Sequence, residues 1–309
     1  MAGEIAKIVG KYSMLLGALE AGGTKMVLAV GDETGHIADK VSIPTTTPDE
    51  TMAGILAYFR KYDIKALGVG CFGPLDLKPS SATYGYITST PKLKWRDFPL
   101  VKTLSEGLWV PVALDTDVNG AALAESAIGA ARGLLSCLYV TVGTGIGGGL
   151  VVEGNLVHGL LHPEFGHMLL RPLKEDTSPT GFCPYHESCL EGLASGPAME
   201  KRWGMSAREL EPDHPAWAME AHYLAQMCVN AIVSFSPEKI ILGGGVMQQQ
   251  HLFPLIRRET LRLLGGYVQH SAILNGMEDY IVPPGLKTES GIKGAFLLAK
   301  RALDRRSGL

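Results

Sequence analysis

Two glycine-rich turns, each lying between two apolar runs, constrain the fold of this 309-residue chain more than any other feature. The first turn joins two apolar runs within residues 15–30, and the second joins two runs within residues 137–152. Apolar runs of strand length that are joined by a short glycine-containing turn predict a β-hairpin. Because the same pattern occurs twice, far apart in the chain, we expect two related domains.

The rest of the chain alternates between patterns typical of strands and patterns typical of helices. Short apolar runs predict strands at 66–72 and 110–114, and longer segments predict helices at 48–62, 98–106, 117–132, 214–235 and 290–305. Strands that alternate with helices indicate an α/β fold, with helices packed on the sheets. The segment 170–189 is rich in Pro, Thr and Ser and shows little periodicity. We expect it to be a long loop that needs an organising contact.

The composition excludes several classes of protein. Hydrophobic residues make up 46% of the chain and charged residues 19%, which is typical of a soluble globular protein. The net charge of −3 offers no basic field for nucleic acid or for an anionic membrane. No apolar run reaches the length that spans a membrane. The length suits two domains around a cleft, with neither nucleic acid nor membrane as a partner.

The N-terminus and the cysteines indicate a cytoplasmic protein. Residues 1–14 carry scattered charges and no continuous apolar stretch, so we expect no secretory signal. Five cysteines in a chain of this size do not form a disulfide framework. Cys71, Cys137 and Cys228 lie in apolar surroundings and are interpreted as buried thiols. The reducing cytosol is therefore the expected compartment.

Each glycine-rich turn has the chemistry of a phosphate-binding site. The first offers backbone amides, a hydroxyl and an ammonium from Gly22, Gly23, Thr24 and Lys25, and the second offers Gly143 and Thr144. Glycines have no Cβ, so a phosphate can approach the amides closely. Either turn alone is equally well interpreted as a plain hairpin turn, which also uses glycine. The matched pair favours one nucleotide bound by both turns.

A carboxylate candidate lies where a predicted strand meets a predicted helix. Asp115 and Asp117 follow the strand at 110–114. Residues at the carboxyl end of a strand point into the crevice where α/β proteins bind ligands. A phosphoryl-transfer enzyme needs a base for the attacking hydroxyl, and Asp117 is the candidate. The alternative is that Asp115 or Asp117 only caps the helix, and spacing alone does not choose.

Two cysteines and two histidines form a candidate metal site. Their pattern is H-x15-C-x2-H-x2-C, from His167, Cys183, His186 and Cys189. Two thiolates and two imidazoles suit a tetrahedral, structural Zn²⁺ with no open coordination position. Chance clustering and a Cys183–Cys189 disulfide are the alternatives, and a cytosolic chain disfavours the disulfide. The site would also fix the nearby Glu164 and Glu191, whose carboxylates suit sugar hydroxyls.

These motifs, taken together, resemble those of the ROK (repressor, ORF, kinase) sugar kinases. The resemblance extends in order over nearly the whole chain through EAGGTK, DTDVNGAALAE, TVGTGIGGGLV, HPEFGHM, CPYHESCLEGLASGP and ILGGGVM. It implies an α/β fold of two actin-like, ribonuclease-H-like domains, with ATP and sugar bound in the cleft between them. The expected N-terminal domain comprises 1–117 plus 290–309, and the C-terminal domain comprises 118–289.

The resemblance also implies roles for individual residues. Asp117 is expected to be the general base, and Gly244 to lie near the nucleotide. Sugar contacts are expected from Asn119, Glu164, His167 and Glu191, and phosphate contacts from Gly22, Gly23, Thr24, Gly143 and Thr144. His167 is also expected to bind zinc. Mg²⁺ is expected to accompany ATP, and the family suggests a homodimer.

Two departures from the common family pattern resemble the bacterial fructokinase branch. Glu20 stands where many glucokinase-like members have Asp, and His186 stands where many have Cys. We therefore expect phosphorylation of the 6-hydroxyl of D-fructose. A glucokinase, mannokinase or N-acylated amino-sugar kinase is the nearest alternative, and a non-catalytic sugar-sensing regulator is the alternative of another class. Only about fourteen residues precede the first expected strand, too few for a helix-turn-helix module.

Overall fold

The computed structural model describes residues 14–306, which form two compact units. Unit 1 contains 14–124, 157–162 and 289–306, and unit 2 contains Glu125–Leu156 and Pro163–Thr288. The expected domain boundary lies at 117/118, whereas the unit boundary divides helix α4 (Asp117–Ile128). The domains 1–117 plus 290–309 and 118–289 therefore stay a prediction. The expectations about a secretory signal and a DNA-binding module fall almost wholly outside the described residues.

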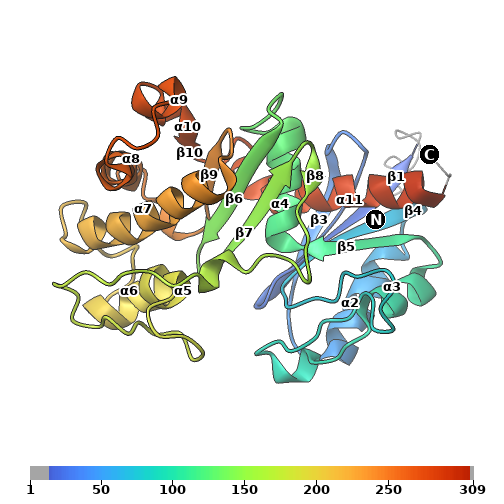
Figure 1. The fold of residues 1–309 in the computed structure, drawn as a ribbon. Helices are drawn as coiled ribbons and strands as arrows, with labels where there is room; N and C mark the ends of the chain where they lie inside the picture. The colour runs from blue at the N-terminus through green and yellow to red at the C-terminus, as the bar shows by residue number, and fades with distance from the viewer. Residues whose placement is uncertain (1–13, 307–309) are drawn as a thin grey trace. The chain divides into compact units, whose positions relative to one another are not determined.

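Unit 1 is built on a five-stranded sheet with the order β3-β2-β1-β4-β5 (Figure 1). Its strands are β1 (Leu15–Ala21), β2 (Lys25–Gly31), β3 (Ile37–Pro44), β4 (Ile64–Cys71) and β5 (Val112–Thr116). The first three strands are antiparallel, and β4 and β5 continue the sheet in parallel on the other side of β1.

Unit 2 repeats this arrangement with the order β8-β7-β6-β9-β10 (Figure 1). Its strands are β6 (Ser136–Val142), β7 (Ile146–Val152), β8 (Asn155–Leu156), β9 (Ile240–Gly243) and β10 (Ile281–Val282). Again three strands form an antiparallel meander, and the later two join its first strand in parallel. The two related α/β units that the repeated hairpins predicted are therefore present.

Helices cover both sheets. Unit 1 contains α2 (Pro48–Phe59), the 3-10 helix η1 (Leu93–Trp95), α3 (Leu100–Leu108) and α11 (Ser290–Arg306). The 3-10 helix η4 (Lys287–Glu289) precedes α11 and spans the boundary between the units. Unit 2 contains η2 (Phe165–His167), α5 (Leu190–Ala194), α6 (Gly196–Trp203), α7 (Ala216–Phe235), η3 (Val246–Gln248), α8 (Leu252–Leu264), α9 (Ser271–Leu274) and α10 (Met277–Tyr280). No helix within 14–306 is long and apolar enough to cross a membrane.

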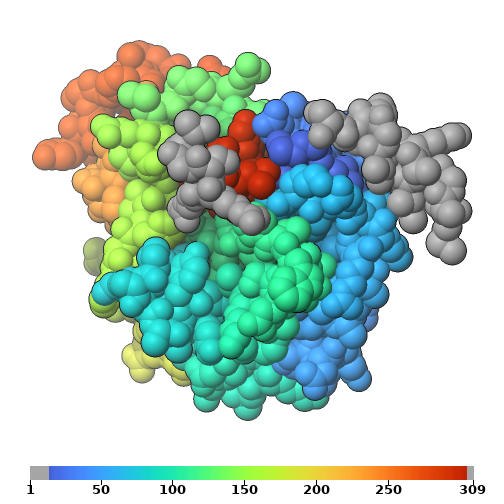
Figure 2. Space-filling model, turned by 90° about the vertical axis from the view of Figure 1, so that its right-hand side faces the viewer, coloured from blue at the N-terminus to red at the C-terminus, as the bar shows by residue number. Residues whose placement is uncertain are grey.

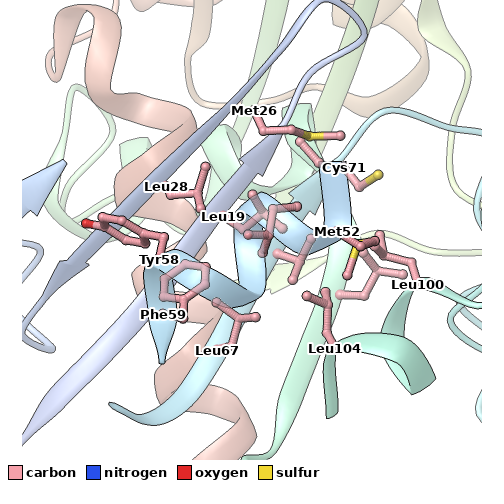
Figure 3. Packing of buried hydrophobic residues seen from close by; sticks show 14 of the residues in the cluster. Leu19, Met26, Leu28, Met52, Tyr58, Phe59, Leu67, Cys71, Leu100 and Leu104 are labelled. Carbon is pink, nitrogen blue, oxygen red and sulfur yellow. The ribbon is translucent and has the colours of Figure 1, made fainter. Parts of the chain in front are cut away.

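Strand β4 shows how the sequence positions the site. Leu67, Val69 and Cys71 are fully buried on one face, in the apolar cluster with α2 and α3 (Figure 3). Side chains alternate along a strand, so Gly68 and Gly70 face the other way. A Cβ at Gly68 would collide with the backbone of α11, and one at Gly70 would lie 3.3 Å from Cα of Asp117. These glycines let α11 and the start of α4 approach the sheet closely.

Candidate functional site

The first glycine-rich turn connects β1 to β2 in unit 1. The amide of Gly22 donates to the carbonyl of Lys25 at 3.0 Å, and Thr45 Oγ1 donates to the Gly22 carbonyl at 2.8 Å. The first bond closes the turn internally, and the second ties it to the segment that follows β3. Among the described residues, the amides of Gly23 and Thr24 have no intramolecular acceptor. The turn therefore keeps backbone donors available for an anion, and phosphate binding there stays a prediction.

Asp117 is the first residue of α4 and is not needed as its cap. Thr116 Oγ1 accepts from the amide of Asn119 at 3.1 Å, which is the bond of an N-cap. Asp117 Oδ1 accepts from the adjacent Val118 amide at 2.9 Å. Burial raises the pKa of Asp117 to about 6, and the Val118 bond opposes this only in part. A carboxylate with a pKa near the working pH suits a general base.

The neighbouring Asp115 organises the helix start instead. Its Oδ1 accepts from the Thr116 amide at 2.8 Å and from Asn119 Nδ2 at 2.7 Å, and its Oδ2 lies 2.9 Å from His158 Nε2. Asn119 is buried, and its Oδ1 has no hydrogen-bond partner within residues 14–306. Asp115 therefore holds the first turn of α4 in place through Thr116 and Asn119. The expected sugar contact from Asn119 stays a prediction.

Glu20, at the end of β1, lies close to the candidate base. Register aligns Glu20 with Gly70 on β4, and Gly70 with Asp115 on β5. The pKa of Glu20 is raised to about 7, mainly by burial and further by the charge of Asp117. Gly291 at the start of α11 leaves room for the Glu20 carboxyl, because a Cβ there would lie 2.7 Å from it. The site thus contains two carboxyls whose ionisation costs free energy.

The second glycine-rich turn connects β6 to β7 in unit 2. Gly143 donates to the carbonyl of Gly145 at 2.9 Å, so this turn too is closed by a backbone bond of its own. Thr144 is exposed at its tip. Glu191, on α5, accepts from the amide of Ile146 at 2.9 Å, and its carboxylate would lie 2.7 Å from a Cβ on Gly145. The structure therefore brings the predicted sugar-binding Glu191 against the predicted phosphate turn.

A cavity of about 320 Å³ opens beside this turn within unit 2. Gly143 and Thr144 form part of its wall, together with the start of α6, the loop after it and the start of η3: Gly196, Pro197, Glu200, Ser206, Ala207, Arg208, Gly245 and Val246. Gly244 adopts a φ of 94°, and a Cβ there would collide with the backbone of Val142. Only glycine lets this chain segment pass so close to β6.

The four predicted metal ligands converge in unit 2. His167 Nδ1 lies 3.9 Å from Cys183 Sγ and 3.8 Å from Cys189 Sγ, and Cys183 Sγ lies 3.7 Å from His186 Nδ1. All four ligand atoms lie within 4.8 Å of one another. Tetrahedral zinc with bonds of about 2.3 Å to sulfur and about 2.05 Å to nitrogen requires roughly 3.6 Å between S and N. The residues present therefore fit a zinc ion, and both cysteines are free thiols rather than a disulfide.

Short chain pairings hold the two ends of the loop 170–189, which carries three of the four candidate metal ligands. Leu169 and Cys189 form an isolated antiparallel bridge, and the Leu190 amide donates to the Met168 carbonyl at 2.9 Å. Between these ends, 170–189 contains no helix or strand, as predicted. The exposed Glu164 accepts from the His167 amide through its carbonyl at 3.0 Å. The predicted sugar residue Glu164 is thus directly connected to a predicted metal ligand.

The predicted residues are divided between the two units. Unit 1 holds Asp117, Asn119 and the first turn, and unit 2 holds the second turn, Gly244, Glu164, His167, Glu191 and the metal ligands. The sequence predicted no role for His158, which lies beside Asp115, or for Lys92, which lies against Gly23. Both contacts join residues far apart in the chain, and no local pattern signals them.

Comparison with known proteins gives one consistent family. The ROK family matches residues 16–302. A fructokinase from Pediococcus pentosaceus is 47% identical over 290 residues, covering 94% of this chain and 99% of that protein. A fructokinase from Zymomonas mobilis is 42% identical over 299 residues, covering 94% and 98%. The crystal structure of a ROK hexokinase from Thermus thermophilus matches with a TM-score of 0.77 at 30% identity, covering 94% and 100%. This chain belongs to the ROK family and has its α/β fold of two actin-like domains.

Proposed function

We propose that this protein is an ATP-dependent fructokinase, which transfers the γ-phosphoryl group of ATP to the 6-hydroxyl of D-fructose. Two relatives named fructokinase, 47% and 42% identical over nearly the full chain, support the choice of sugar. The observation that carries the chemistry is Asp117, a carboxyl at the end of a strand whose pKa burial raises to about 6.

Asp117 acts as the general base in this reaction. The sugar oxygen forms a bond to the γ-phosphorus, the bond from that phosphorus to the bridging oxygen of ADP breaks, and the hydroxyl proton passes to Asp117. Thr116 caps α4, so the Asp117 carboxylate is not needed for the N-cap hydrogen bond. The reaction needs little covalent chemistry from the protein, so positioning and charge stabilisation supply most of the catalysis.

MgATP is the expected phosphoryl donor. The amides of Gly23 and Thr24, the exposed Lys25 and the second turn with Thr144 are its proposed phosphate contacts. The cavity beside the second turn, which Gly245 also lines, has room for the nucleoside. Close approach of backbone amides to phosphate is what glycine-rich turns permit.

Fructose is bound by carboxylates and imidazole in the proposal. Glu164, His167 and Glu191 are the contacts expected from unit 2, and Asn119 is expected from unit 1. Zn²⁺ on His167, Cys183, His186 and Cys189 would hold both ends of the loop 170–189, beside which Glu164 and Glu191 lie in the sequence. The metal supplies structural support only, because four protein ligands leave no position for substrate.

Assembly and location belong to the same proposal. We propose a homodimer in the cytoplasm, in line with the family resemblance and with the five cysteines, which form no disulfide among the described residues. Equilibrium sedimentation at several protein concentrations tests the dimer. A monomer at all concentrations would contradict it.

A panel of sugars tests the proposed function. We expect kcat/KM with MgATP to be higher for fructose than for glucose, mannose and N-acetylmannosamine. Glucose ahead of fructose would replace the fructokinase assignment by that of another hexose kinase. Sugar binding without any ATP turnover would instead support a non-catalytic regulator.

A further inference from the structure

Lys92 lies across the first glycine-rich turn. An ideal Cβ on Gly23 would be 2.6 Å from Lys92 Cε and 3.4 Å from Lys92 Nζ. The end of the lysine side chain therefore packs directly on Gly23. It occupies the space that the Cβ of any other residue at position 23 would need. Its ammonium lies beside the turn whose Gly23 and Thr24 amides have no intramolecular acceptor among the described residues.

The backbone around Lys92 is firmly held. The Lys92 carbonyl accepts from the Trp95 amide at 2.8 Å, which closes η1, and the Lys92 amide lies 3.3 Å from Thr90 Oγ1. Trp95 is 1% exposed, and its Nε1 donates to the Thr46 carbonyl at 2.9 Å. The segment between β4 and α3 that carries these residues lies at the surface of unit 1 (cyan to turquoise in Figure 2). The buried Trp95 thus fixes the backbone at Lys92, whose own side chain is only partly buried.

The charge of Lys92 is not neutralised by the protein. Within residues 14–306, Lys92 Nζ has no carboxylate within ion-pair distance and no hydrogen-bond acceptor, whereas Lys40 and Lys65 have carboxylate partners. A cation beside unpaired backbone amides attracts anions, and phosphoryl oxygens accept from both kinds of donor. The preformed site is therefore complementary to a phosphate group.

The position of the turn indicates which phosphate this is. Glu20 precedes the turn, and its carboxyl is close enough to Asp117 for that charge to raise its pKa. The proposed base takes the proton of the attacking hydroxyl, so the phosphorus under attack must lie within bonding reach of that hydroxyl. The turn between β1 and β2 is therefore near the transferred group rather than near the nucleoside.

We propose that Lys92 is a further catalytic residue, whose ammonium binds the non-bridging oxygens of the γ-phosphoryl group during transfer. This inference rests on the proposed kinase function. Lys92 stays protonated throughout: the proton of the hydroxyl goes to Asp117, and ADP leaves with the bridging oxygen. A fixed positive charge stabilises the negative charge that develops on the phosphoryl oxygens. It lowers the activation barrier because it does not have to reorient during the reaction.

The test compares Lys92→Met with Lys94→Met, which is a matched control in the 3-10 helix that begins directly after Lys92. Lys94 is exposed and lies outside the proposed site. Lys92→Met should lower kcat by about 100-fold, as loss of one fixed donor does. Lys92→Arg should recover part of the loss because the charge is kept, and Lys94→Met should stay within about twofold of the wild type.

Nucleotide binding gives a readout that does not depend on turnover. By calorimetry, Lys92→Met should weaken binding of a non-hydrolysable ATP analogue by about 10- to 100-fold and that of ADP much less. The affinity for fructose should change little. Gly23→Ala is a second variant, because its new methyl group would displace the Lys92 side chain and should reproduce the pattern.

The outcomes separate the inference from the function on which it rests. A wild-type protein that phosphorylates no sugar overturns the proposed function, and the calorimetric ratio of ATP analogue to ADP still tests Lys92. Equal weakening of ATP analogue and ADP would overturn the γ-phosphoryl assignment. A rise in fructose KM alone, with both nucleotide affinities kept, would make Lys92 a sugar contact and overturn the proposal.

Discussion

At the scale of single residues, the site combines a carboxylate that must ionise with surroundings that oppose ionisation. The pKa of Asp117 is raised to about 6 and that of Glu20 to about 7, in both cases mainly by burial. A base needs such a pKa to accept a proton readily near neutral pH. The same burial makes the ionised carboxylates a cost to the folded state.

Activity should depend on the ionised form of Asp117. Asp117→Asn should lower kcat by roughly 10²–10⁴-fold, the usual contribution of a positioned base, with a smaller effect on sugar affinity. In the wild type, kcat should fall as the pH drops through about 6, because the protonated carboxyl cannot accept the proton. Steady-state kinetics over pH 5–9 checks both expectations. Near-wild-type turnover of a folded Asp117→Asn variant would remove Asp117 from the mechanism.

Stability should respond to pH in the opposite sense. The pKa of Asp117 is higher in the folded chain than its ordinary 3.8, so the folded state binds this proton more tightly. Its stabilising contribution is present below pH of about 4 and is lost as the pH rises through about 6. Asp117→Asn, which cannot ionise, should therefore unfold a few degrees above the wild type at pH 8, with no such gain at pH 4.

The size of this effect has an upper bound. The rise in the pKa of Asp117 from 3.8 to about 6 corresponds to at most roughly 3 kcal/mol in the free energy of unfolding, and to less for a partly exposed side chain. Asp213→Asn, at an exposed position in unit 2, is the control in the same calorimetric scans. A variant with the melting temperature of the wild type at both pH values would contradict the expectation.

At the scale of elements, we expect the loop 170–189 to depend on zinc bound by the four candidate ligands, because it has little regular structure of its own. Between the bridge at its ends, residues 170–189 make no helix or strand. Buried polar contacts support one flank: Arg202 Nε lies 2.9 Å from Asp176 Oδ1, and Tyr223 donates to the other oxygen at 2.5 Å. On the other flank, near Cys183 and His186, the backbone bond from the Phe182 amide to the Gly192 carbonyl, at 2.8 Å, holds the chain.

Loss of zinc should therefore affect sugar binding more than nucleotide binding. Strong chelation or Cys183→Ser frees Glu164 and Glu191, and a displacement near 1 Å can cost about 100-fold in a positioned site. We expect a large rise in KM for fructose, a small rise in KM for ATP and a lower melting temperature. Zn²⁺ should restore the chelated protein, and Mg²⁺ alone should not.

Metal content measured by plasma mass spectrometry, together with both KM values, decides this prediction. Zinc-free protein that keeps its sugar KM would disprove it, as would active purified enzyme without zinc. Tyr185→Phe, an exposed change within the same loop, is the control for simple disturbance of the loop.

At the scale of the whole molecule, the repeated topology has a functional consequence. The two proposed phosphate turns occupy equivalent hairpins, β1–β2 in unit 1 and β6–β7 in unit 2. One nucleotide bound by both turns would link the two units through a single ligand. Such linkage favours closed states, which exclude water as a competing phosphoryl acceptor.

Joint ligand binding should therefore compact the protein. Saturating fructose with a non-hydrolysable ATP analogue should give a smaller radius of gyration in small-angle scattering than either ligand alone or neither. The affinity-impaired Lys92→Met variant should need more analogue to reach the same state. An unchanged radius at saturation of both ligands would rule out closure.

The two hairpins, several of the helices and strands, and the grouping of the four candidate metal ligands could be predicted from the amino-acid sequence, because each depends on local or chemically distinctive patterns. Glycine-rich turns between apolar runs predict the hairpins β1–β2 and β6–β7 from local sequence alone, independently of the tertiary contacts made by the rest of the chain. Two thiols and two imidazoles around one segment without periodicity are a donor set typical of zinc.

The choice between the carboxylate that organises the helix and the one available for chemistry required the folded chain. Spacing left Asp115 and Asp117 as candidates for the cap, whereas the hydrogen bond from the Asn119 amide assigns the cap to Thr116. Burial, which raises the pKa of Asp117, depends on α11 and β4 packing from distant parts of the chain. Lys92 was not predictable for the same reason, because its contact with Gly23 exists only once the chain has folded.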